Sequence, residues 1–139
     1  MKYPATFTED KDAGGFVVTF RDIPEAITQG DTEEEAMAMA EDVLLDSIDW
    51  YLDGKKAVPL PSKPQAGDKL VELPVSVSAK VMLLNEMLAQ KVRPVDLSRM
   101  MGIRSQDVTR ILDLRHNTKI DTVCAAFKAL GKSVELRIQ

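Results

Sequence analysis

The first thirty residues contain two runs in which apolar and polar positions alternate. Residues 3–8 alternate, and in residues 16–20 the aromatic and valine side chains at every second position share one face. Residues 9–15, EDKDAGG, separate these runs and have the composition of a hairpin loop. A short third strand is expected over residues 26–29, bounded by a proline and a glycine. A period of two is typical of half-buried strands, so the pattern predicts a small β-sheet.

A helix is predicted to follow this sheet. Thr32 and Glu35 have the spacing of a capping box, in which a hydroxyl and a carboxylate bind free backbone N–H groups at a helix start. Beyond them, apolar residues recur every three or four positions, and acidic residues lie mostly around the other side. The apolar positions are Ala36, Ala40, Val43, Leu44, Ile48, Tyr51 and Leu52. One amphipathic helix should therefore pack on the sheet and end at Gly54.

The remainder of the chain changes from an extended to a helical pattern. Residues 55–68 hold three prolines in a polar setting, which favours a semi-rigid connector. Residues 70–75, LVELPV, look like one more strand, which either completes the sheet or leads into a second module. From Ser78 the pattern is helical, Pro94 is expected to be the first residue of a new helix, and residues 133–138 alternate again.

The predicted fold class is therefore α+β with two domains. A sheet-plus-helix domain occupies residues 1–75, including the connector, and an all-helical domain that ends in a short strand occupies residues 76–139. The terminal alternation, SVELRI, is expected to pair with the same segment of a second copy, since an unpaired apolar strand edge favours association.

Charge divides the chain at the same place. Residues 1–75 hold seven Lys/Arg and sixteen Asp/Glu, a net charge of −9, whereas residues 76–139 hold eleven and six, a net charge of +5. Such an asymmetry indicates two modules with different partners. The basic half suits phosphate groups, and the acidic half would repel nucleic acid and suit a basic protein surface.

Composition excludes several classes of protein. No apolar run approaches the roughly 20 residues needed to span a bilayer, and the N-terminus lacks the apolar core of a secretory signal. We therefore expect a cytoplasmic protein without a membrane partner. A single cysteine and a single histidine offer no set of metal ligands, so no metal and no cofactor are expected.

The most specific motif is residues 94–114, PVDLSRMMGIRSQDVTRILDL, which has the spacing of a helix-turn-helix. Leu97 and Met101 are expected to face the core from the first helix, and Ser98 is small where the helices cross. Gly102 supplies the unusual backbone angles of the turn. Ile103, Val108 and Ile111 complete the predicted core.

This arrangement leaves polar residues on the start and outer face of the second helix, which enters the major groove in this motif. They are Arg104, Ser105, Gln106, Thr109 and Arg110. Glutamine binds adenine bidentately and arginine binds guanine, so these residues are candidate base readers. The loop that follows contains candidate phosphate contacts, which set the position on DNA without reading sequence. They are Arg115, Asn117, Thr118 and Lys119.

Two family resemblances rest on these motifs. Residues 102–112, GIRSQDVTRIL, followed by residues 116–131, HNTKIDTVCAAFKALG, resemble the lambda-repressor-like helix-turn-helix family, although many of its members place Gln where this chain has Pro94. Residues 14–44, GGFVVTFRDIPEAITQGDTEEEAMAMAEDVL, resemble the N-terminal domain of HicB antitoxins.

The HicB resemblance implies a partial ribonuclease-H-like fold that binds and blocks a HicA-type toxin, a small ribonuclease that cleaves messenger RNA. It also implies a C-terminal domain that represses the toxin–antitoxin operon by binding operator DNA, in a homodimer or homotetramer. An antitoxin of this kind is not an enzyme.

Two other functions compete with this interpretation. Ribonuclease-H-like folds cleave nucleic acid with carboxylates around metal ions, and the candidates here are Asp10, Asp12, Asp22, Glu25 and Asp31. Most of them lie in predicted loops, and their spacing matches no metal cluster. In the second alternative, the chain is a transcriptional regulator whose acidic domain senses a small ligand.

Overall fold

A computed structural model describes all of residues 1–139, and it is a mixed α+β structure, as predicted. The chain divides into two compact units, each described here by itself. One contains residues 1–50 and 59–75, and the other contains residues 51–58 and 76–139.

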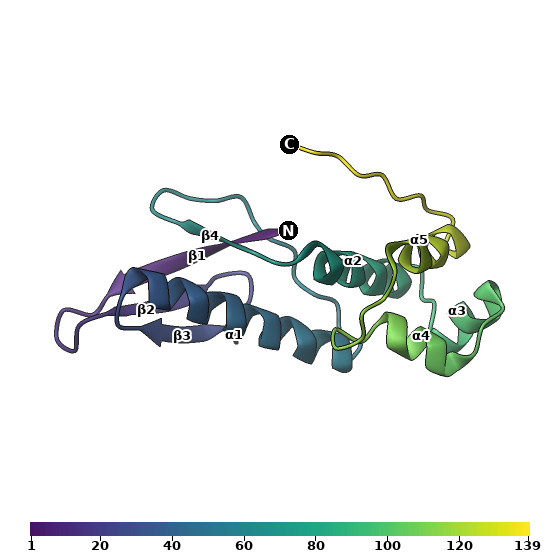
Figure 1. The fold of residues 1–139 in the computed structure, drawn as a ribbon, viewed down its shortest axis with the longest axis horizontal. Helices are drawn as coiled ribbons and strands as arrows, with labels where there is room; N and C mark the ends of the chain where they lie inside the picture. The colour runs from purple at the N-terminus through teal and green to yellow at the C-terminus, as the bar shows by residue number, and fades with distance from the viewer. The chain divides into compact units, whose positions relative to one another are not determined.

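The first unit is built on a four-stranded antiparallel sheet with the order β3-β2-β1-β4 (Figure 1). The strands are β1 (Lys2–Glu9), β2 (Phe16–Phe20), β3 (Ile27–Gly30) and β4 (Lys69–Glu72). The hairpin and the short third strand were both predicted. The segment that begins at residue 70 does complete the sheet, because β4 pairs with β1 and brings Val71 opposite Tyr3.

Helix α1 (Glu33–Asp53) lies along one face of this sheet (Figure 1). The predicted capping pair forms in part: the Glu35 N–H donates to Thr32 Oγ1 at 3.1 Å, as expected. The Glu35 carboxylate accepts at 3.1 Å from the N–H of Asp31, one residue before the Thr32 N–H that a capping box would use. The core combines every second residue of the strands with the predicted apolar stripe of the helix. Its members include Tyr3, Ala5, Val18, Phe20, Val71, Ala36, Ala40, Leu44 and Ile48.

Gly30 is required where β3 meets the start of α1. A Cβ atom at this position would lie 2.4 Å from the Ala36 nitrogen and 2.7 Å from the Ala36 Cα. These neighbours are helix backbone and cannot move aside as a flexible side chain would. The absence of a side chain at residue 30 therefore sets how closely the helix approaches the sheet.

The proline-rich segment has no regular secondary structure, as expected, but side chains from the end of β2 hold it in place. The Asp22 carboxylate accepts from the Ser62 N–H at 3.0 Å and from its hydroxyl at 2.9 Å. Arg21 donates to the Lys63 carbonyl at 3.1 Å and forms a 2.7 Å ion pair with Asp68. The second half of the connector, residues 62–68, is thus fastened to the end of β2.

The second unit contains four helices. They are α2 (Val75–Ala89), α3 (Pro94–Met101), α4 (Ser105–Ile111) and α5 (Ile120–Ala129). Their buried side chains form one core, to which each helix contributes: Val77, Val81, Leu84, Met87, Leu97, Val108, Ile111, Val123 and Ala126. Residues before the helices join this unit as well, because the Asn85 amide exchanges two hydrogen bonds, of 2.8 and 3.0 Å, with the backbone of Val58.

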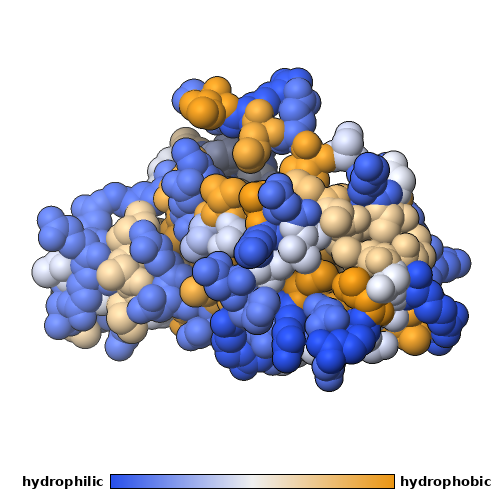
Figure 2. Space-filling model, turned by 45° about the vertical axis from the view of Figure 1, so that its right-hand side comes forward, coloured by the Kyte–Doolittle hydropathy of each residue, from blue (hydrophilic) through white to orange (hydrophobic).

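The predicted strand at residues 133–138 is absent from the single chain. Residues 132–139 have no regular secondary structure, and Leu136 and Ile138 are 76% and 101% exposed. Figures 1 and 2 show this tail standing clear of the helices, with both apolar and hydrophilic residues exposed. A strand needs a hydrogen-bonded neighbour, and the helical unit contains no strand that could provide one.

Candidate functional site

Helices α3 and α4 form a compact pair joined by a three-residue turn. Leu97 of α3 and Val108 of α4 are completely buried, and Ser98 is only 6% exposed. Gly102 has the left-handed backbone angles φ 68° and ψ 33°, and the Ile103 N–H donates to the Ser98 carbonyl at 3.0 Å to close the turn. The glycine and the small serine therefore do what their positions in the sequence predicted.

The five predicted base readers all lie on the exposed side of this pair. Arg104 precedes the first turn of α4, Ser105 and Gln106 lie in that turn, and Thr109 and Arg110 follow one turn later. All five are exposed, whereas Val108 and Ile111 point into the core. The helix therefore presents a continuous polar face that carries two guanidinium groups and one amide.

Asp107, which the sequence analysis did not single out, links these two arginines. Its carboxylate lies 3.3 Å from Arg104 Nε and 3.7 Å from Arg110 Nη1, and it accepts from the Arg104 N–H at 3.3 Å. The hydrogen bond from the Arg104 side chain lowers the pKa of the Asp107 carboxyl below its ordinary value, so this group stays ionised.

An arginine–aspartate pair with the same spacing lies at the start of α3. Arg93 pairs with Asp96 at 3.1 Å, and the Asp96 carboxylate accepts from the Arg93 N–H at 2.9 Å. Arg99, one turn along, lies 3.9 Å from the same carboxylate. The repeated spacing R-x-x-D at residues 93–96 and 104–107 is the sequence signal from which both pairs could have been found.

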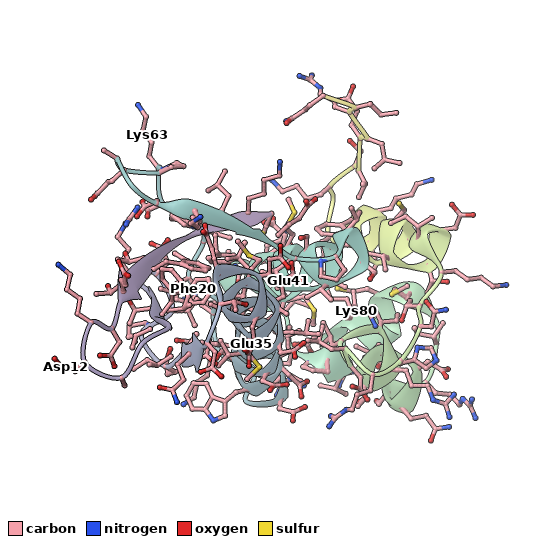
Figure 3. The ribbon with its side chains drawn as sticks, turned by 60° about the vertical axis from the view of Figure 1, so that its left-hand side comes forward. Asp12, Phe20, Glu35, Glu41, Lys63 and Lys80 are labelled. Atoms are coloured by element: carbon pink, nitrogen blue, oxygen red, sulfur yellow. The ribbon has the colours of Figure 1, made fainter.

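A buried lysine of α2 holds the loop that contains the predicted phosphate contacts, residues 113–119. Lys80 of α2 is only 3% exposed, and its ammonium group donates to the carbonyls of Asp113 and His116 at 2.6 and 2.7 Å and to the Thr118 hydroxyl at 3.0 Å. Burial lowers the pKa of Lys80. Figure 3 shows Lys80 on α2 among the helices.

Lys80 was not among the predicted functional residues, because a lysine in a helical pattern is expected on the solvent side. Its spacing could have revealed it, since it lies three or four positions from the apolar residues Val77, Leu83 and Leu84 and shares their helical face. The contact also fixes the role of Thr118, which is half-buried and bonded to Lys80 and to the His116 ring at 3.0 Å. Thr118 therefore shapes the loop from inside.

The other loop residues remain at the surface. Asn117 and Lys119 are exposed, and together with Arg110 they line an open hollow of about 720 Å³ between α4 and the start of α5. Arg115 is exposed too and pairs with Asp113 at 3.1 Å and with Asp53 at 3.3 Å. Thr118 lines the same hollow, so the structure brings one predicted residue of α4 and three of the loop together. Arg104, Ser105, Gln106, Thr109 and Arg115 lie outside it.

The five carboxylates considered for hydrolysis do not gather at one site, although Asp10 and Asp31 line the same small hollow beside the hairpin. Asp10 accepts hydrogen bonds from the backbone of its own hairpin loop, and Asp22 is occupied by Ser62 of the connector. No group of three or more His, Cys, Asp or Glu side chains is placed to hold a metal ion. No helix has the length and apolar character needed to cross a membrane.

Comparison with known proteins identifies the family. Residues 2–82 match the family described as HicB_like antitoxin of bacterial toxin-antitoxin system. The chain belongs to this antitoxin family. It is 47% identical over 136 residues to Antitoxin HicB 2 of Photorhabdus laumondii, covering 98% of this chain and 95% of the relative. It is 46% identical to Antitoxin HicB of Escherichia coli K12, with 98% of both chains covered.

A more distant relative extends the similarity. Antitoxin HicB of Pseudomonas fluorescens Pf0-1 is 31% identical over 130 residues, which cover 93% of this chain and 89% of the relative. The HicB resemblance of residues 14–44 is therefore confirmed, and the similarity to HicB antitoxins extends through both units. Membership in a toxin–antitoxin family implies an antitoxin role with a toxin as partner.

Replacing Lys80 with Met tests the buried contact, because it keeps an apolar stem and removes the ammonium group. The His116 carbonyl and the Thr118 hydroxyl lose the ammonium donor, while the Asp113 carbonyl keeps the His116 N–H at 3.1 Å. An unsatisfied buried polar group costs roughly 1–3 kcal/mol. We expect urea denaturation to show a fall of about that size in the free energy of unfolding of the helical unit. Amide hydrogen exchange should also quicken in residues 113–118.

The matched control is Lys128→Met on α5, where the lysine is exposed. Exposed positions usually change stability by no more than about 0.5 kcal/mol. If the Lys80→Met and Lys128→Met proteins were equally stable, the Lys80 contact would not support the loop.

Proposed function

We propose that this chain is an antitoxin that binds and neutralises a HicA-type, mRNA-cleaving toxin and represses its own operon by binding DNA. The observation that carries the proposal is the similarity to curated HicB antitoxins over almost the whole chain. We assign toxin binding to residues 1–75, with their net charge of −9, and DNA binding and dimerisation to residues 76–139, with their net charge of +5. Both activities belong in the cytoplasm.

In this proposal, α3, the turn at Gly102 and α4 act as a helix-turn-helix. Helix α4 enters the major groove, where Gln106 and Arg110 read base edges, and Arg104, Ser105 and Thr109 support them. The exposure of all five side chains on one face supports this assignment. Arg115, Asn117 and Lys119 contact phosphates, and Thr118 holds the loop that carries them.

We further propose that the chain acts as a homodimer or homotetramer through its C-terminal tail. Val134, Leu136 and Ile138 alternate with polar residues and are all exposed in the single chain. Pairing with the tail of a second copy would supply the missing hydrogen-bond partner and cover these side chains.

The antitoxin proposal is tested by co-expressing the chain with the small open reading frame beside its gene. We expect that frame to encode a small basic protein that stops growth alone and is harmless in complex, because an acidic module can cover its RNA-binding surface. Pull-down and growth curves measure both effects. Failure to recover a partner or restore growth would instead favour a regulator that senses a small ligand.

The DNA-binding proposal predicts that Gln106→Ala and Arg110→Ala weaken specific binding most. Each good bidentate base contact discriminates by about 1–3 kcal/mol, so affinity for the operon's promoter should fall about 5- to 150-fold. Affinity for scrambled DNA should change much less. Fluorescence anisotropy at fixed salt measures both, with Lys119→Ala as the control that weakens both DNAs alike. Equal losses for Gln106→Ala on both DNAs would reassign that residue to backbone contact.

Removing residues 133–139 tests the oligomer proposal. The truncated chain should have a smaller mass in light scattering, since the paired tails are lost, while the helical content measured by circular dichroism is retained. A full-length protein carrying Leu136→Asp should behave in the same way, because a charge at an apolar pairing position disfavours the contact. An unchanged mass for both variants would assign oligomerisation to another surface.

A further inference from the structure

The first unit has an open hollow beside the edge of its sheet. The hollow measures about 460 Å³ and is lined by Glu41, Asp42 and Leu45 of α1 and by residues 72–75, which end β4 and follow it. It lies at an edge because β4 is the last strand of the order β3-β2-β1-β4. Figure 3 shows Glu41 on α1, away from the hairpin loop that carries Asp12.

The floor of the hollow is apolar and ordered. Leu73 is only 1% exposed, and its N–H donates to the Met1 carbonyl at 2.9 Å, which continues the pairing beyond β4. Leu45 is half-buried, and Pro74 and Val75 are exposed, Val75 to 65%. An exposed valine beside a fixed leucine floor offers a place for an apolar side chain of a partner.

The charged groups that line the hollow are all carboxylates. Glu41, Asp42 and Glu72 are exposed, and none of them forms a salt bridge. Lys2 stands opposite Glu72 in the strand register, yet it forms no salt bridge and does not line the hollow. The cations that do form ion pairs in this unit serve other carboxylates: Lys69 pairs with Glu33, and Arg21 pairs with Asp68.

The apolar floor and the carboxylates together limit which kind of molecule can bind in the hollow. Nucleic acid would be repelled by three carboxylates that form no ion pair, and the same surface of a second copy would be repelled for the same reason. A protein that binds RNA must carry cations that face the RNA phosphates. Carboxylates around an apolar floor are complementary to a protein surface of this kind.

We propose that a basic, RNA-binding toxin docks in this acid-rimmed hollow. One apolar side chain of the toxin packs on Leu45, Leu73 and Val75, and its lysines or arginines face Glu41, Asp42 and Glu72. This inference rests on the proposed toxin-neutralising function and names the surface that performs it.

The test compares two variants of the full chain that have the same net charge. Glu41→Lys/Asp42→Lys reverses the rim, and Glu9→Lys/Asp12→Lys reverses two exposed carboxylates at the hairpin. The probe is the purified product of the small toxin gene beside this one, and biolayer interferometry gives its Kd and its two rate constants. Circular dichroism confirms that both variants fold.

The rim variant should raise the Kd for the toxin at least about tenfold, mainly by slowing association, and the difference should shrink at high salt. The hairpin variant should stay within about twofold of the wild-type chain, since charge far from the contact is screened. Val75→Ser should speed dissociation, whereas Leu60→Ser, an equally exposed apolar position on the connector, should not.

Three results would overturn the assignment in distinguishable ways. If the wild-type chain binds the toxin and both rim and Val75 variants bind it equally well, the hollow is not the docking site and the antitoxin function stands. If the rim and hairpin variants lose affinity equally, only net charge matters. If the wild-type chain itself does not bind the toxin, the docking site and the proposed function fail together.

Discussion

The helical unit depends on a charged group in its interior, the ammonium of Lys80. Removing a charge from water is costly unless hydrogen bonds replace the lost hydration, and here two carbonyls and one hydroxyl do so. Those acceptors belong to a loop without regular secondary structure, whose backbone groups would otherwise need water. The lysine and the loop therefore satisfy each other, and the positions of Asn117 and Lys119 beside Arg110 follow from this contact.

The two units handle their surface charges in opposite ways. Every arginine in residues 76–139 lies within 4 Å of a carboxylate two or three residues away, as Arg104 does with Asp107 and Arg115 with Asp113. The carboxylates around the α1–β4 hollow have no such partner. Exposed ion pairs contribute only about 0–1 kcal/mol, so a phosphate can displace an aspartate from an arginine at little cost. The local pairs thus position the guanidinium groups and leave them available to an anion such as phosphate, as the proposed DNA binding requires.

Local patterns predicted the elements, and long-range contacts lay beyond them. Alternation predicted β1 and β2, the Thr32 and Glu35 spacing predicted the start of α1, and Gly102 predicted the turn between α3 and α4, because each depends on neighbouring residues. The pairing of β4 with β1 joins residues almost seventy positions apart, and the sequence left it open. Lys80 was missed because periodicity only separates apolar from polar residues. It cannot show that two carbonyls and one hydroxyl of residues 113–118 accept hydrogen bonds from this lysine. The strand predicted at residues 133–138 is absent for a related reason. Alternation indicates a preference for extended backbone, but a strand also needs a hydrogen-bonded neighbour.

These differences in pairing explain how one chain can carry an acidic surface and a basic surface together. A chain with unpaired arginines and unpaired carboxylates would tend to bind itself or its copies, since opposite net charges of −9 and +5 attract. Each arginine of residues 76–139 already lies beside a carboxylate of its own segment, so a carboxylate from elsewhere gains little over the one already in place. A phosphate backbone presents many negative charges in a row and releases counterions when bound, so it competes better than any single carboxylate. No cation lines the acidic hollow, so the partner proposed for it must bring cations and an apolar side chain together.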